Sequence, residues 1–358
     1  MTNKISIMDT TLRDGSYAVD FSFTCSDTSI ICKELEDSGL NYIEIGHGVG
    51  LSASKKGYGK SFQTDEQYMI SAETTLKRAK YGMFCIPDIA ELKDVELAAK
   101  HNMGFIRIGT NVTDIRSSKE FIKTAKDCGM FVTANFMKSY VLSPEQFAKK
   151  VSLSEKFGAD LVYLVDSAGG LFAEDIHRYY AAIRNITDIP LGFHGHDNLG
   201  MAVSNSVEAV RVGFDFVDTS LQGLGRSSGN AATEILVAAL LKLGYDLDID
   251  FLKLLDIGQK YIQPLITSNG KMPLDIVAGF ADFHSSYMHY IQKYSAKYRA
   301  NPALLIIGIC KVDKVDLNEQ TLDALAKSLR NTEDIFLGKY NFNKYIGREQ
   351  EVVDGNNK

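Results

Sequence analysis

An alternation of short apolar segments with longer segments of helical pattern runs through the first 245 residues, and it constrains the fold more than any other feature. The short segments read as buried strands at residues 4–12, 41–46, 82–87, 105–109, 131–135, 161–166, 190–193 and 214–220. The helical segments that follow them lie at residues 26–38, 65–80, 91–101, 119–128, 144–157, 173–185, 201–212 and 230–243. Eight strand–helix units in a stretch of this length predict a (β/α)8 TIM barrel of the α/β class. The alternative is a doubly wound open sheet, which favours a glycine-rich phosphate loop after an early strand, and residues 11–16 supply none.

The remainder of the chain is helical in pattern and does not continue the strand repeat. We therefore expect a catalytic barrel at residues 1–245 and a helical C-terminal domain at residues 246–350, packed on or near the barrel mouth. Residues 351–358 read as a frayed polar tail.

Two histidines, His194 and His196, follow the seventh predicted strand. Alternate residues of a strand face the same way, so both imidazoles project together while Gly195 leaves room between them. Two imidazoles side by side at the end of a strand can hold one divalent metal. The alternative is a pair of histidines whose hydrogen bonds are satisfied within a loop.

A carboxylate at the end of another strand favours the metal interpretation. Catalytic side chains of a TIM barrel come from the C-terminal ends of different strands, so Asp14 would lie at the same mouth as the histidines. Asp14, His194 and His196 then form a two-histidine, one-carboxylate set with open positions for a substrate. Because oxygen atoms would make up much of the coordination sphere, the set favours Mn²⁺ or Mg²⁺ over a closed structural zinc site. Zn²⁺ and Co²⁺ are not excluded as the bound metal. Arg13 beside this set can offer a fixed cation to a carboxylate or enolate, or it forms only a surface ion pair with Asp14.

Composition excludes several other classes of protein. The formal charge of −6 argues against binding to a nucleic-acid backbone as the main activity. No uninterrupted apolar run approaches the ~20 residues that span a bilayer, and the first residues lack the pattern of a secretory signal. The five cysteines include no Cys-x-x-Cys motif, so we expect reduced core thiols in a cytoplasmic protein.

Five motifs follow one another along the barrel segment: TTLRDG at residues 10–15, IEIGHG at 43–48, DSAG at 166–169, HGH at 194–196 and GLGRSSGNA at 223–231. As a set they resemble the 4-hydroxy-2-oxovalerate aldolases, within the wider pyruvate-carboxylase-like and HMG-CoA-lyase-like metal-dependent barrels. The resemblance covers nearly the whole barrel and continues weakly into the C-terminal domain.

The resemblance implies a carbon–carbon lyase of the class II pyruvate aldolase type. A divalent metal, first of all Mn²⁺, would chelate the carboxylate and keto oxygens of a 4-hydroxy-2-oxoacid. Cleavage of the C3–C4 bond would release an aldehyde and a pyruvate enolate, stabilised by the metal and by Arg13. Family members often pair with an aldehyde dehydrogenase, so a dehydrogenase subunit or a homo-oligomer is a candidate partner beside the small 2-oxoacid and aldehyde.

Three further residues are assigned weaker roles. We expect Ser167 to help hold the substrate carboxylate, although the DSAG motif could equally serve the turn. Glu44 and Asn230 are expected to orient the metal ligands from behind, and Asn230 could instead coordinate directly.

The chain departs from the family pattern at two positions. The family places a basic histidine in an Arg-Asp-Gly-x-His motif, and here Tyr17 occupies that position. In the C-terminal domain His284 stands where the family has a tyrosine. We interpret this as an exchange of imidazole and phenol across one pocket, with His284 as the base titrating near neutrality. The alternative is two unrelated substitutions, with Tyr17 in packing and His284 on a surface.

Two other functions remain open. A condensing enzyme that uses an acyl-CoA donor, or an HMG-CoA-lyase-like lyase, would carry the same Arg-Asp-Gly and His-x-His elements. A barrel that has lost its base could serve only as a scaffold, but Arg13, Asp14, His194 and His196 together argue against a decayed site.

Overall fold

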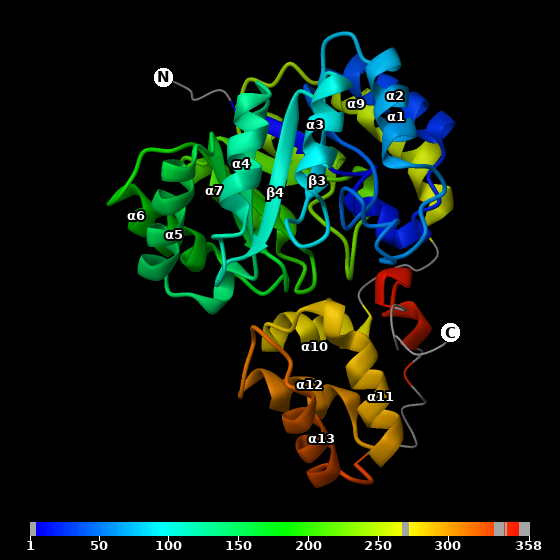
Figure 1. The fold of residues 1–358 in the computed structure, drawn as a ribbon, viewed down its shortest axis with the longest axis vertical. Coiled ribbons are helices and arrows are strands. Elements are labelled where there is room, and N and C mark those ends of the chain that lie inside the picture. Colours follow the sequence, from blue (N-terminus) through cyan, green and yellow to red (C-terminus); the bar gives the residue numbers. More distant parts are fainter. Residues whose placement is uncertain (1–4, 267–271, 333–339, 341, 351–358) are drawn as a thin grey trace.

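Eight parallel strands close a barrel in chain order in the computed structural model, which describes residues 5–266, 272–332, 340 and 342–350 (Figure 1). The strands are β1 Ser6–Asp9, β2 Tyr42–Glu44, β3 Lys80–Cys85, β4 Phe105–Asn111, β5 Phe131–Met137, β6 Leu161–Asp166, β7 Leu191–Gly195 and β8 Phe216–Thr219. Pairing of β1 with β8 closes the barrel, with Ser6 opposite Phe216 and Asp9 opposite Thr219. The predicted TIM barrel is therefore confirmed, and the open sheet is wrong.

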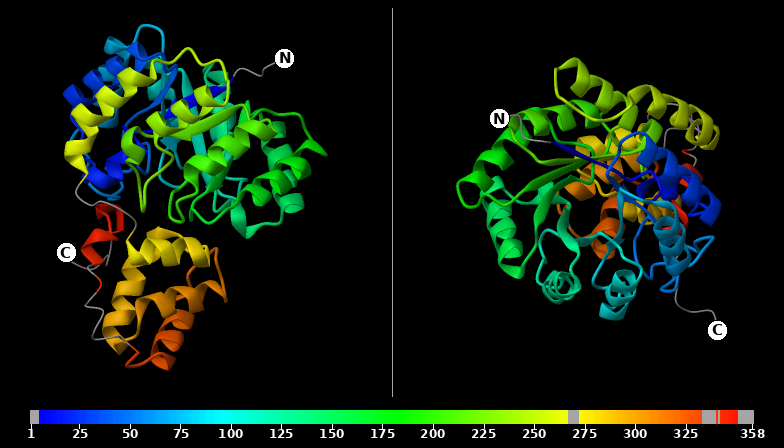
Figure 2. Two further views of the ribbon diagram at one scale, coloured as in Figure 1. Left: turned by 180° about the vertical axis from the view of Figure 1, so that it is seen from behind. Right: turned by 90° about the horizontal axis from the view of Figure 1, so that it is seen from above.

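Helices cover the outside of the barrel, as the view along the strands shows (Figure 2). They are α1 Cys25–Asp37, α2 Asp65–Thr75, α3 Leu92–Lys100, α4 Ser118–Asp127, α5 Pro144–Phe157, α6 Ala173–Arg184, α7 Ala202–Val212 and α8 Thr233–Lys242. Capping boxes start three of them, because the side chains of Thr24, Thr64 and Ser143 accept a hydrogen bond from the backbone three residues on. Their apolar faces join one continuous core with the outward faces of the strands.

The helix expected at residues 65–80 is too long, because α2 ends at Thr75. Glu36 at the end of α1 explains the early end. Its Oε1 accepts the backbone N–H groups of residues 77, 78 and 79 at 2.9, 2.6 and 2.8 Å. These hydrogen bonds replace those of a continuing helix, and the chain enters β3 at Lys80.

The inside of the barrel changes from apolar to charged toward the C-terminal ends of the strands. Met8, Phe105, Leu161, Tyr163 and Phe216 form a buried apolar cluster at the opposite end. Two residues beyond Phe105 on the same face of β4 lies Arg107, whose guanidinium is 4.5 Å from the Tyr163 ring centroid. The charged layer begins there, and the site is built on it.

The C-terminal helices lie across one end of the barrel, in Figure 1 and from behind in Figure 2. They are α10 Pro273–Ala281, α11 Met288–Tyr298, α12 Pro302–Cys310 and α13 Glu319–Ser328, and they share a core of their own. The β4 arrow in Figure 1 points toward them, so they face the mouth where the strands end. No helix in the described ranges is long and apolar enough to cross a membrane.

Helix α9, Phe251–Ile257, packs against α1 and α8, and Leu254 and Ile257 belong to the core of the barrel. The expected division between residues 245 and 246 falls before this helix. We propose instead that the division lies after Ile266, because the first buried residue of the second core is Leu274. The tail expected at residues 351–358 lies outside the described residues.

Candidate active site

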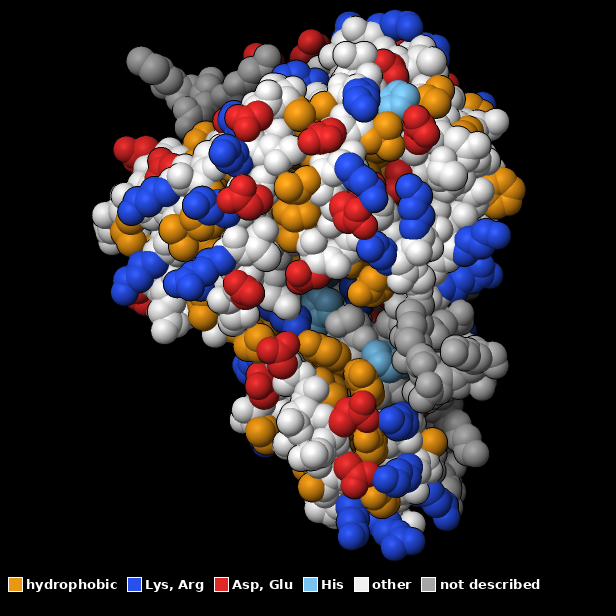
Figure 3. Space-filling model, in the orientation of Figure 1, with side chains coloured by type: hydrophobic (Ala, Val, Ile, Leu, Met, Phe, Trp, Pro, Cys, Tyr) orange, Lys and Arg blue, Asp and Glu red, His pale blue; other side chains and the backbone are white. Residues whose placement is uncertain are grey.

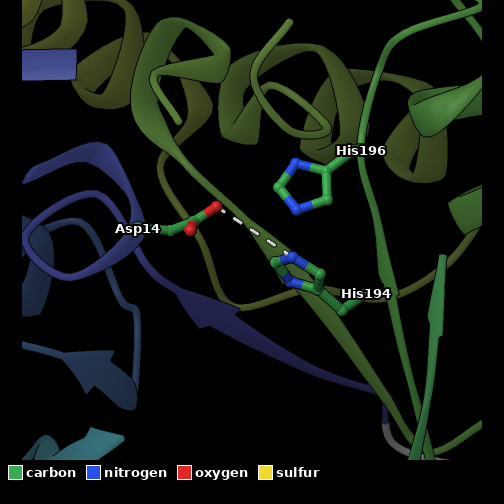
Figure 4. Close-up of side chains that lie close together, drawn as sticks. All are labelled: Asp14, His194 and His196. Atoms are coloured by element: carbon green, nitrogen blue, oxygen red, sulfur yellow. Dashed lines mark ion pairs between the residues drawn. The ribbon is translucent and has the colours of Figure 1, made fainter. Parts of the chain in front are cut away.

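Asp14, His194 and His196 meet at the mouth of the barrel. Asp14 opens a short 3-10 turn after β1, Asp14–Val19, while His194 lies in β7 and His196 directly follows that strand. All three are buried, and one ligand atom from each lies within 4.8 Å of the other two. Figure 4 shows the carboxylate and both rings around one space, with 4.0 Å between His194 Nε2 and Asp14 Oδ2. The structure thus brings together the set expected from the sequence.

Hydrogen bonds fix how both imidazoles face this space. His194 Nδ1 lies 2.9 Å from Asp218 Oδ2, and His196 Nδ1 lies 3.3 Å from the carbonyl oxygen of Gly229. Carboxylate and carbonyl oxygens accept, so Nδ1 donates in each case and Nε2 keeps its lone pair. This is the arrangement of a metal-binding histidine held from behind by an acceptor.

Burial and charge favour the protonation states that a metal needs. Burial lowers the pKa of His196 to about 4, although Asp14 acts against that shift. Burial alone would raise the pKa of Asp14, but Arg13 and the two histidines outweigh it and hold that pKa well below its usual range. The His196 ring and the Asp14 carboxylate are therefore in the states that suit a divalent cation.

Asn230 adds a further oxygen beside the ligands. Its Nδ2 donates to Asp14 Oδ2 at 2.6 Å, which is the contact that its predicted role in orienting the carboxylate requires. Its Oδ1 is buried and accepts no hydrogen bond within the described part of the chain. An orphaned buried oxygen next to this set supports the fit of a cation.

Arg13 is buried, so the alternative interpretation as a surface ion pair with Asp14 is wrong. Its Nη1 donates to Asp14 Oδ1 at 2.9 Å, and its Nε donates to Glu44 Oε2 at 2.7 Å. Arg107 Nη1 donates to the same Glu44 oxygen at 2.8 Å, and Arg107 Nη2 donates to Asp218 Oδ2. Glu44 thus holds the two arginines, and Arg13 connects it to Asp14, so its role in orienting the metal ligands stays a prediction.

Arg107 and Asp218 were missed by the sequence analysis. Each is a single charged residue inside an otherwise apolar strand, FIRIG and FVDT. A charge in such a place is retained only when it is paired, which is the signal that could have found them. Together they link Glu44 to His194 behind the site.

A cavity of about 600 Å³ opens between the barrel mouth and the C-terminal helices. Figure 3 shows histidine side chains, in pale blue, at the hollow between these two parts. The cavity is lined by Arg13, Asp14, Tyr17, Ser167, His194, His196 and His284 among others. Ser167 Oγ accepts the backbone N–H of Lys138 at 2.9 Å, so its own hydrogen can be donated into the cavity.

Tyr17 and His284 line this same cavity, from the turn after β1 and from the start of the short turn Ser285–Tyr287. Burial raises the pKa of the Tyr17 phenol, so it keeps its proton at neutral pH. His284 Nδ1 lies 2.7 Å from Ser286 Oγ and accepts the Ser286 backbone N–H at 3.3 Å. Because a backbone N–H only donates, the proton of the neutral ring is at Nε2.

The expectation that His284 titrates near neutrality is wrong. Burial lowers its pKa well below the usual value, and the positive charges of Arg226 and Lys138 lower it further. The ring therefore stays neutral near pH 7 and offers Nε2–H as a donor.

Comparison with known proteins agrees with this geometry. The HMGL-like family model matches residues 4–260. The chain belongs to the HMGL-like family. It is 33% identical to a 4-hydroxy-2-oxovalerate aldolase of Carboxydothermus hydrogenoformans over 92% of this chain and 98% of that protein. It is 35% identical to one of Pelotomaculum thermopropionicum over 86% of this chain and 90% of that protein.

Solved structures share the fold at lower identity. The HMG-CoA lyase of Bacillus subtilis superposes with a TM-score of 0.61 at 19% identity, covering 75% of this chain and 96% of that one. The carboxyl transferase domain of Rhizobium etli pyruvate carboxylase gives a TM-score of 0.75 at 16% identity, covering 92% of this chain and 62% of that one. The second likeness extends beyond the barrel, since it covers most of this chain.

Proposed function

We propose that this protein is a divalent-metal-dependent aldolase that cleaves or forms a 4-hydroxy-2-oxoacid from pyruvate and an aldehyde. The observation that carries the proposal is the buried set Asp14, His194 and His196 beside Arg13 in one cavity. Similarity to proteins named 4-hydroxy-2-oxovalerate aldolase over most of both chains supports this choice of reaction.

Asp14, His194 and His196 would hold the metal, with Asn230 Oδ1 as a further candidate ligand. We propose Mn²⁺, with Mg²⁺, Co²⁺ and Zn²⁺ as alternatives, because the set mixes imidazole nitrogens with hard oxygens. When bound, the ion supplies a Lewis acid that polarises the keto oxygen of the 2-oxoacid.

Arg13 and Ser167 would bind and orient the 2-oxoacid. Arg13 Nη2 has no hydrogen-bond partner among the residues described, whereas Nε and Nη1 are held by Glu44 and Asp14. A guanidinium fixed in this way needs no reorganisation to donate to an oxygen that becomes negative during the reaction. The Ser167 hydroxyl can donate to the carboxylate.

Tyr17 and His284 would act on the C4 oxygen. Both hold a proton at neutral pH, so in synthesis they would polarise the aldehyde carbonyl. In cleavage they would donate hydrogen bonds to the C4 oxygen and so hold the aldehyde half in place. The exchange of phenol and imidazole stays a proposal, and the double variant Tyr17→His with His284→Tyr tests it. Measurable activity of that variant supports a shared pocket, and loss of all activity while metal and pyruvate still bind argues against it.

The reaction itself is tested with purified protein, Mn²⁺, pyruvate and a panel of aldehydes, with product formation followed by NMR. The matched alternative assay offers acetyl-CoA with 2-oxoacids and measures free thiol. Aldol product without CoA release supports the proposal. CoA release without aldol product would make the protein an acyl-CoA-dependent condensing enzyme.

A partner that oxidises the released aldehyde, or a second copy of this chain, is proposed as the physiological assembly. Co-purification at native expression followed by mass spectrometry tests both. We also propose a cytoplasmic location, because all five cysteines are free thiols.

A further inference from the structure

Four cationic side chains line the cavity, and two of them have no carboxylate within hydrogen-bond distance among the described residues. Arg13 and Arg107 are neutralised by Glu44, Asp14 and Asp218. The other two are Lys138 and Arg226. Buried positive charge without a hydrogen-bonded counter-ion is unfavourable, so this pair calls for an explanation.

Lys138 directly follows β5 and is only 3% exposed. Its ammonium donates to the Tyr287 hydroxyl at 3.0 Å and to the carbonyl oxygen of Val315, both neutral acceptors. In the part of the chain that is described, it forms no ion pair with a carboxylate. Burial lowers its pKa to about 8, against the opposing influence of Asp316 and Asp313. An ammonium has three donors, so one remains for a ligand.

Arg226 lies in the glycine-rich loop after β8, with its guanidinium 5.1 Å from the Tyr17 ring centroid. Its Nε and Nη2 are buried, and neither is hydrogen-bonded to any described residue. Its ion pair with Glu349 spans 3.8 Å, which is too long for a hydrogen bond. Nε and Nη2 are therefore two donors that a planar oxyanion can occupy, in competition with the Glu349 carboxylate.

The two cations lie near the groups proposed to act on the C4 oxygen. Arg226 stacks on Tyr17, and both Arg226 and Lys138 are close enough to His284 to influence its charge. This end of the cavity would take the aldehyde half of the substrate, whereas Arg13 and the metal ligands would take the pyruvate half.

We propose that the aldehyde half of the substrate carries an oxyanion, a carboxylate or a phosphate, and that Lys138 and Arg226 bind it. The inference rests on the proposed aldolase function and names its substrate class. A guanidinium with two unsatisfied donors beside an ammonium without an ion pair suits both anions, so the assay separates them.

The test uses pairs of aldehydes that differ in charge. Glyoxylate is compared with acetaldehyde, and glyceraldehyde 3-phosphate with glyceraldehyde, each added to pyruvate and Mn²⁺. We expect kcat/KM to be at least about tenfold higher for the charged member of one pair, since hydrogen bonds to charged groups are worth one to two powers of ten. The pair with the larger ratio identifies the anion.

Lys138→Met and Arg226→Gln should each reduce that ratio about tenfold or more, because each removes one cation. The matched control is Lys149→Met, an exposed lysine on α5, which should keep the wild-type ratio. Wild-type preference for the neutral aldehydes, or equal loss of both rates in both variants, would overturn the inference.

A second measurement separates this inference from the proposed function. Exchange of the pyruvate methyl protons with D2O needs metal and enolate formation but no aldehyde. If exchange occurs but charged aldehydes are not preferred, the proposal of an anionic aldehyde is wrong, whereas the proposed aldolase function is unaffected. Absence of exchange overturns both. If the variants raise the KM for pyruvate in this exchange and keep the aldehyde ratio, the two cations bind pyruvate and the inference is wrong.

Discussion

Replacing Asp218 by asparagine tests whether the charged layer inside the barrel sets up the metal ligands. The carboxylate accepts from His194 Nδ1 at 2.9 Å and pairs with buried Arg107. Both contacts are made by the same oxygen, Oδ2, whereas Oδ1 is buried without a hydrogen-bond partner among the described residues. An amide oxygen in the place of Oδ2 can still accept from both groups, but it is neutral. His194 then loses the charged acceptor that fixes its tautomer, and Arg107 loses half of its counter-charge.

The structure sets the size of both effects. Mutation of the acceptor behind a metal-binding histidine typically lowers metal affinity about 10–100-fold, which corresponds to about 1.4–2.7 kcal/mol. Arg107 keeps Glu44 as a partner, so we expect a loss of unfolding free energy of about 3 kcal/mol, at the low end for a broken buried pair.

The assay is calorimetric titration of Mn²⁺ into the Asp218→Asn variant at neutral pH, with urea unfolding of the same sample to confirm that it is folded. The control is Asp215→Asn, since Asp215 Oδ2 accepts from the Leu191 backbone at the other end of the same strands. An unchanged Mn²⁺ affinity in a folded Asp218→Asn protein would refute the reasoning.

The other predictions follow from single contacts. Arg13→Ala should lower kcat far more than it raises KM, and Arg13→Lys should restore only part of the rate because lysine lacks the planar fork; a change in KM alone would make Arg13 a binding residue. His284→Ala should reduce kcat without changing the pH dependence of the rate between pH 6 and 7, and loss of that pH dependence would show that His284 is the general base. Ser286→Ala should lower the rate about tenfold, because it removes the hydroxyl that holds the His284 ring. His47 accepts the Val49 N–H, and burial lowers its pKa to about 4 from the usual 6.5, so the unfolded state binds its proton first as the pH falls. The unfolding free energy should therefore fall by about 2–3 kcal/mol between pH 7 and pH 4.5, and His47→Gln should remove that part of the decrease in urea titrations.

Periodicity was sufficient to predict the barrel because each strand is short, buried and followed by an amphipathic helix. It failed at residues 76–80, where Glu36 from another helix holds three backbone N–H groups. That contact joins residues about 40 positions apart, and no local pattern encodes it. Asp14, His194 and His196 could be predicted to lie together because the C-terminal ends of all strands of a TIM barrel meet at one mouth.

The groups behind and above the ligands were harder to predict. Arg107 and Asp218 come from strands far apart in sequence, and only the closed barrel brings them together. The state of His284 depends on burial and on Lys138 and Arg226, which reach it from two other loops. A sequence gives the usual pKa of an imidazole, whereas the shift is a property of the folded cavity.

We propose that Asp14, His194 and His196 hold a divalent ion that supports chemistry on pyruvate. Deuterium exchange into the pyruvate methyl group tests this in wild type and His196→Ala, with bound metal measured in the same samples. We expect stoichiometric metal and exchange in the wild type, with both lost in a folded His196→Ala protein. Full exchange by a metal-free His196→Ala protein would show that these residues do not hold a catalytic metal.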